Sequence, residues 1–122
     1  MQTSVHTDTH RQDQAHRRLA ANKVLRLLAI EERYLRAAST AIRQRARSAE
    51  VNQRSVDEIM TSIQNSRDLA PAQVETDTCV AEYPHLREIV GPRRARIMSE
   101  ERRKIEQALK PDQDARRLAR IK

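Results

Sequence analysis

Apolar side chains recur every seven residues along the first half of the chain. A strict seven-residue repeat keeps one stripe of a helix turned toward a neighbouring helix and favours a left-handed supercoil. Taking Leu28 as position a of the repeat places Val24 and Ile59 at position d. No glycine or proline interrupts the repeat between residues 19 and 63. We call the apolar positions of this stripe the seam: Val24, Leu28, Leu35, Ile42, Ala49, Val56, Ile59 and Ile63.

The seam is strongest at its two ends. Large apolar side chains gather at 24–35 and again at 56–63, whereas the span between them holds mainly alanine around Ile42. Burial of apolar surface contributes about 25 cal/mol per Å², so we expect the two ends to supply most of the stabilisation. Arg45 and Asn52 stand at d positions, where they either set the register of a helix pair or lie open to water.

The repeat also sets the limits of the first two predicted segments. Residues 1–13 are polar and aperiodic and are predicted to form a flexible tail. Residues 14–68 are predicted to form one long coiled-coil-like helix, which ends before Pro71 because the residue preceding a proline is pushed out of the helical region. About fifty residues of helix would be roughly 75 Å long.

The second half of the chain is predicted to return along this helix in shorter pieces. Residues 69–91 form a partly helical connector, in which the closing Gly91 is typical of a helix end. Residues 92–122 form a basic C-terminal helical segment that Pro111 breaks or kinks. The predicted fold class is therefore all-α: a long heptad-patterned helix with shorter returning helices, in a helical hairpin or coiled coil.

Composition agrees with helices and argues against other folds. The 122 residues include one glycine and no phenylalanine or tryptophan, which argues against sheets, phosphate-cradling loops and a thick globular core. The net charge is +7 and is unevenly placed. Residues 67–91 carry a net charge of −3, whereas residues 1–66 and 92–122 carry +4 and +6, so an acidic connector separates two basic regions.

Arginine supplies 20 of the 24 basic residues. Its planar fork suits carboxylates and phosphates. Five arginines lie away from the seam of the predicted helix, where they either stay solvated or bind an acidic protein surface or the phosphates of a nucleic acid. Glu50 and Asp57 interrupt this stripe. We call it the basic face, and its members are Arg33, Arg36, Arg43, Arg47 and Arg54.

The chemistry of a catalytic or metal site is missing from the sequence. There is no glycine-rich loop, no Cys/His cluster and no nucleophile elbow, so we expect a protein that is not an enzyme and uses no cofactor, metal or small-molecule substrate. His6 and His10 are four residues apart, but nothing completes a metal site around them. Cys79 is the one cysteine and is expected to be a small buried hydrophobe.

The same residues bear on location. A lone cysteine allows no internal disulfide and favours a reducing compartment. No apolar run approaches the ~20 residues that span a bilayer, so no transmembrane segment is expected. We expect an intracellular, cytoplasmic protein, and targeting to an organelle stays open.

Two functions compete. In the first, the chain is an interaction or assembly subunit: a returning helix of about eighteen residues, ~27 Å, cannot cover the long helix, so the rest of the seam binds a partner helix or a second copy. In the second, the chain is a basic helical nucleic-acid-associated protein, such as a ribosomal or chromosomal accessory, that holds phosphates through its arginines. A membrane-surface helix over residues 23–35 is a third, less favoured reading because no Trp or Phe is present.

Overall fold

The computed structural model describes the backbone of residues 2–121 and the side chains of residues 11–121. Within these residues the chain is helical and contains no strand, which confirms the predicted all-α class. The elements are α1 (Gln2–Gln44), α2 (Ala49–Asn52), α3 (Val56–Gln64), α4 (Ala70–Glu82), the 3₁₀ turn η1 (Pro84–Leu86) and α5 (Arg87–Ile121).

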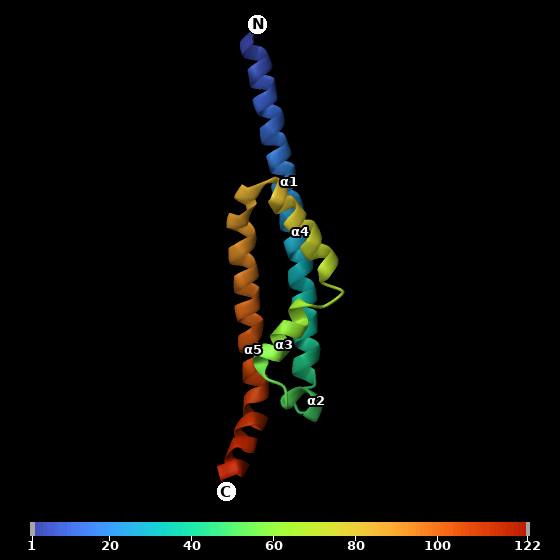
Figure 1. The fold of residues 1–122 in the computed structure, drawn as a ribbon, viewed down its shortest axis with the longest axis vertical. Helices are drawn as coiled ribbons and strands as arrows, with labels where there is room; N and C mark the ends of the chain where they lie inside the picture. The colour runs from blue at the N-terminus through green and yellow to red at the C-terminus, as the bar shows by residue number, and fades with distance from the viewer. Residues whose placement is uncertain (1, 122) are drawn as a thin grey trace.

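The elements form an elongated helical hairpin (Figure 1). The helices α1 and α5 lie side by side and run in the same direction, while α3 and α4 run in the opposite direction. Helix α3 contacts both α1 and α5, and α4 packs on α1. Helix α1 contacts α3, α4 and α5, and α5 also contacts α2 and α3. The N-terminal part of α1 and the C-terminal part of α5 extend past the other helices at opposite ends (Figure 1).

The predicted long helix is shorter at its C-terminal end than the repeat indicated. Helix α1 ends at Gln44, not near residue 68. The backbone N–H of Ser48 donates to the carbonyl of Arg45 at 2.9 Å, and the Ser48 hydroxyl donates to the same carbonyl at 2.8 Å. Ser48 is extended, with φ −71° and ψ 143°, and begins α2. Such local serine bonds compete with a continuing helix, so the heptad pattern is wrong as a guide to the backbone here.

A second serine begins α3. Ser55 is extended, with φ −70° and ψ 155°, and its hydroxyl accepts the backbone N–H of Glu58 at 3.1 Å. A serine followed three residues later by glutamate is the sequence signature of a capped helix start. The chain thus turns twice between Gln44 and Val56, and the second apolar end of the seam folds back against the first.

The prolines end fewer helices than expected. Pro71 lies in the first turn of α4, where its missing N–H costs no hydrogen bond, so the connector contains a complete helix. Pro92 and Pro111 lie inside α5, which continues through the predicted stop at Gly91. Both prolines are exposed, so water can reach the carbonyl that each leaves without an intrahelical donor.

The first helix begins earlier than predicted. Its backbone is helical from Gln2, although residues 1–13 were expected to form a tail. The side chains of His6 and His10 lie outside the described residues. From Arg11 to Leu19 every side chain is exposed.

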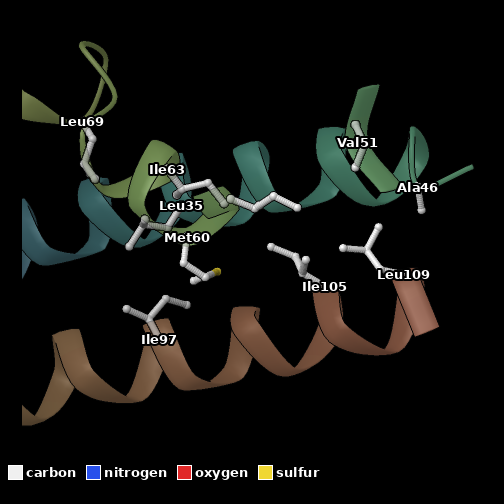
Figure 2. Packing of buried hydrophobic residues seen from close by; sticks show 10 residues of the cluster. Leu35, Ala46, Val51, Met60, Ile63, Leu69, Ile97, Ile105 and Leu109 are labelled. Atoms are coloured by element: carbon white, nitrogen blue, oxygen red, sulfur yellow. The ribbon is translucent and has the colours of Figure 1, made fainter. Parts of the chain in front are cut away.

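The core has two parts. Figure 2 shows the larger cluster, in which Ile97, Ile105 and Leu109 of α5 point toward side chains of α1 and α3. The smaller cluster joins α1 to α4, η1 and α5, and its buried members are Ala20, Val24, Leu27, Leu28, Cys79, Leu86 and Val90.

Candidate functional site

The seam is used inside the chain. Val24 and Leu28 are buried in the smaller cluster, and Leu35, Ile59 and Ile63 in the larger one. The expectation that part of the seam is left uncovered by a single returning helix needs correction, because α3, α4 and α5 all pack on α1. A role of these residues in binding a partner stays a prediction.

The remaining seam positions lie nearer the surface. Ile42 and Val56 are partly buried against the larger cluster, and Ala49 is exposed on α2. Neither polar d residue sets a helix register. Arg45 is exposed and paired with Glu50, and the amide of Asn52 donates to the carbonyl of Arg47 at 3.0 Å.

The basic face is divided among separate elements. Arg33, Arg36 and Arg43 lie on α1, whereas Arg47 is in the turn after it and Arg54 is between α2 and α3. A continuous stripe is therefore wrong, because it required one helix through residue 54. Arg43 donates to the hydroxyls of Ser39 (3.3 Å) and Thr40 (3.1 Å). The exposed arginines of the set, Arg33, Arg36 and Arg47, have no carboxylate of residues 11–121 within ion-pair distance.

A second group of arginines meets Arg54 in a cleft of about 500 Å³. The cleft lies between the α2–α3 loop and the C-terminal part of α5. We call it the arginine cleft. It is lined by Asn52, Gln53, Arg54, Ser55, Val56, Glu58, Gln113, Arg116, Arg117 and Arg120.

Helix periodicity explains the α5 side of the arginine cleft. At about 100° per residue, Gln113, Arg116, Arg117 and Arg120 fall within one sector of roughly 100°. The loop side depends on Ser55, because its cap starts α3 and leaves Arg54 just before the helix. These three α5 arginines carried no prediction. Their shared face was the available signal, but the opposing wall could not be seen without the turn at Ser48.

Several basic side chains earlier in α5 are paired with carboxylates, although Arg87 and Arg103 have no ion pair among the described residues. Arg96, Arg102 and Lys104 pair along the helix with glutamates three or four residues away. Arg93 and Arg94 instead reach across to α1, where they pair with Glu32 and Glu31 at 2.9 and 3.0 Å. Among the described residues, the arginines without a carboxylate partner include Arg116, Arg117 and Arg120 near the C-terminal end of α5.

A buried carboxylate joins three helices. Glu31 of α1 is 2% exposed, accepts two hydrogen bonds from Arg94 and one from the hydroxyl of Thr76 on α4 at 2.7 Å. Arg94 also donates to Asp77 at 2.7 Å. Burial lowers the pKa of Arg94, but the hydrogen bonds and charges of Glu31 and Asp77 outweigh it and raise the pKa above its usual range. This arrangement holds the hairpin together and offers no open position for a substrate.

Three further expectations concern the cysteine, metal ligands and membrane-spanning helices. Cys79 is buried and free, as expected. Among the described residues, no three His, Cys, Asp or Glu side chains are grouped to hold a metal ion. Within the same part of the chain, no helix is both long and apolar enough to cross a lipid bilayer.

Comparison of the chain with known protein families, with curated proteins and with solved structures finds no match.

Proposed function

We propose that the protein is a non-enzymatic interaction subunit that binds a helix of another protein, or of a second copy, along an exposed strip of α1. In this proposal the strip, and not the seam, binds the partner helix. Its apolar members Leu19, Ile30 and Tyr34 are exposed. At about 100° per residue they lie within roughly 60° of one another. Ala37 and Ala41 continue the strip and leave room for a close neighbour.

The single observation that supports this proposal most is the concentration of exposed apolar side chains on α1. Four of the seven large exposed hydrophobics of the described residues lie on this helix, namely Leu19, Leu25, Ile30 and Tyr34, and the other three are divided between α4 and α5. Beside Tyr34 there is a hollow of about 140 Å³ whose wall includes Leu35, Ile63 and Leu69. Apolar surface rimmed by charged residues marks sites of association in soluble proteins.

Sedimentation velocity at increasing protein concentration tests self-association, and Ile30→Glu tests the strip. Leu25→Glu is the matched control, because Leu25 is 41% exposed and Ile30 39% on the same helix, but about 140° apart around it. We expect a concentration-dependent oligomer that Ile30→Glu weakens about tenfold or more and Leu25→Glu leaves intact, since a buried charge costs more than ~1.4 kcal/mol.

Equal behaviour of the two variants would contradict the strip. A monomer at every concentration would reject the second copy as the partner and leave only a different helical protein. Circular dichroism of both variants checks that each retains the helical fold. An intracellular, cytoplasmic setting is part of this proposal, because Cys79 has no second cysteine to pair with.

The second candidate is binding of nucleic-acid phosphates. It is supported by Arg33, Arg36 and Arg47, which are exposed and without carboxylate partners, and by the net charge of +7. Phosphate binding of this kind weakens steeply as salt is added, because the release of counterions from the nucleic acid then gains less entropy. Fluorescence anisotropy with a labelled duplex should show binding at low salt that is lost as salt is added. Absence of binding at low salt would dismiss this candidate.

A further inference from the structure

The arginine cleft collects positive charge that the protein itself does not neutralise. Arg54, Arg116, Arg117 and Arg120 line it, and Glu58 is its one acidic residue. Among the described residues, no ion pair joins any of these four guanidinium groups to a carboxylate, whereas Arg93, Arg94 and Arg102 of α5 all have such partners. Like charges held together without counterions repel, so the cleft is more stable with an anion bound.

Two of the four arginines are already positioned. Arg54 Nη2 donates to the Ser62 hydroxyl at 2.5 Å and to the carbonyl of Glu58 at 3.4 Å. Arg116 Nη2 donates to the carbonyl of Asn52 on the opposite wall. Each guanidinium has five N–H donors, so both arginines keep donors for a ligand after these contacts. Because the anchors limit their motion, less side-chain entropy is lost on binding.

The neighbouring acidic residue does not compete for the cleft. Asp57 follows Val56 in the first turn of α3, but its carboxylate accepts from Arg102 Nη2 at 2.5 Å. Arg102 belongs to the middle of α5 and does not line the cleft. Asp57 therefore adds no charge to the cleft, and the four arginines there face the single lining carboxylate of Glu58.

We infer that the arginine cleft binds a phosphate group, carried either by a small phosphate compound or by a nucleic-acid backbone. A phosphate presents several oxygens that planar guanidinium forks contact in pairs, and its negative charge matches converging arginines. Gln53, Gln113 and Ser55 add neutral donors around the same space. This site is separate from the exposed strip of α1 and does not rest on the proposed assembly function.

Isothermal titration at low ionic strength tests the site with inorganic pyrophosphate and, in a second arm, with a short single-stranded oligonucleotide. The site variant is Arg117→Gln with Arg120→Gln, since both side chains are exposed and neither is hydrogen-bonded or ion-paired within the described part of the chain. The control is Arg11→Gln with Arg18→Gln on α1, which removes the same charge from an exposed surface away from the cleft and outside the arginines of the second candidate function.

We expect binding in at least one arm that the site variant weakens about tenfold or more, since a hydrogen bond to a charged group contributes ~1.5–3 kcal/mol. The control should change affinity by less than about threefold, because surface charges are screened. Binding of pyrophosphate identifies a small phosphate compound as a sufficient ligand, and binding of the oligonucleotide alone identifies a nucleic-acid backbone. Absence of binding in both arms, or equal weakening by the site variant and the control, would overturn the inference.

The outcome is independent of the assembly proposal. Sedimentation velocity of the site variant should match that of the unaltered protein, since its two substitutions lie far from Ile30 along the chain and on another helix. Ile30→Glu should retain its phosphate affinity for the same reason. Either proposal can therefore fail without the other.

Discussion

Arg94 of α5 holds Glu31 of α1 with two parallel hydrogen bonds, from Nε to Oε1 and from Nη2 to Oε2, each 3.0 Å long. Glu31 is almost fully buried and Arg94 is partly exposed. The pair joins the two longest helices of the hairpin across 63 residues of sequence. Removal of the Arg94 side chain would leave the carboxylate of Glu31 in the interior with a single neutral donor, the hydroxyl of Thr76.

Arg94→Met should therefore destabilise the protein by about 3 kcal/mol, because a buried carboxylate that loses its partner keeps its desolvation cost. Urea denaturation followed by circular dichroism measures the change in the free energy of unfolding. Arg96→Met is the control: its pair with Glu100 is exposed and 4.0 Å long, so the expected loss is below about 0.5 kcal/mol. Equal losses in the two variants would show that the Glu31 pair contributes no more than a surface contact.

The pKa of Arg94 predicts how this contribution varies with pH. The folded-state pKa is raised above the unfolded value, so the stability that it supplies is complete below the unfolded pKa and is lost only as pH rises through the folded one. Both values lie in the strongly alkaline range. The difference in unfolding free energy between the unaltered protein and Arg94→Met should thus be the same at about pH 7 and about pH 10. A difference that shrinks over this interval would contradict the assignment.

Thr76 is the remaining ligand of Glu31, and its hydroxyl also lies 2.8 Å from the carbonyl of Ala72. Thr76→Val keeps the shape of the side chain but removes the donor, so we expect a loss of about 1–2 kcal/mol in the free energy of unfolding. Thr78→Val is the matched control on the same helix, because the Thr78 hydroxyl bonds to the Val74 carbonyl at an exposed position. Its expected effect is below about 0.5 kcal/mol.

Much of the fold follows from the sequence. The seven-residue repeat correctly marks Val24, Leu28 and Leu35 as buried, because the face of α1 that they share must be covered whatever covers it. It fails after Gln44 because apolar spacing alone does not record where the backbone turns. Ser48 and Ser55 carry that information, because the hydroxyl of each bonds to the backbone of a residue three positions away.

The prolines of α5, the Glu31 ion pair and the arginine cleft are features that the sequence did not predict. Pro92 and Pro111 lie at exposed positions of α5, where a missing N–H costs little, so a stop was predicted where the helix continues. Glu31 is buried by partners 45 and 63 residues away, and no local pattern predicts them. Of the arginines that line the cleft, only Arg54 was singled out, because the wall supplied by α5 depends on the return of the chain.

The larger cluster should depend strongly on Leu109. This residue of α5 is fully buried in the larger cluster, next to Ile105 (Figure 2). Leu109→Ala should lower the free energy of unfolding by about 2–5 kcal/mol, since both transfer energy and a cavity contribute. Leu118→Ala on the same helix is the control, because Leu118 is 61% exposed and should lose less than about 0.5 kcal/mol. A small effect of Leu109→Ala in urea denaturation would place this end of α5 outside the cooperative core.

The buried carboxylate of Glu101 lowers the stability of the core. It is 2% exposed and lies on the same face of α5 as Ile97 and Ile105. Lys104 Nζ is 3.1 Å from Oε1, but Oε2 has no hydrogen-bond partner. Glu101→Met keeps the length of the side chain and removes the buried charge, so we expect the free energy of unfolding to rise by about 1–2 kcal/mol. Glu100→Met, at a less buried position beside it, should change stability by less than about 0.5 kcal/mol. A loss of stability in Glu101→Met, measured by urea denaturation, would show instead that the carboxylate stabilises the fold through a partner at Oε2.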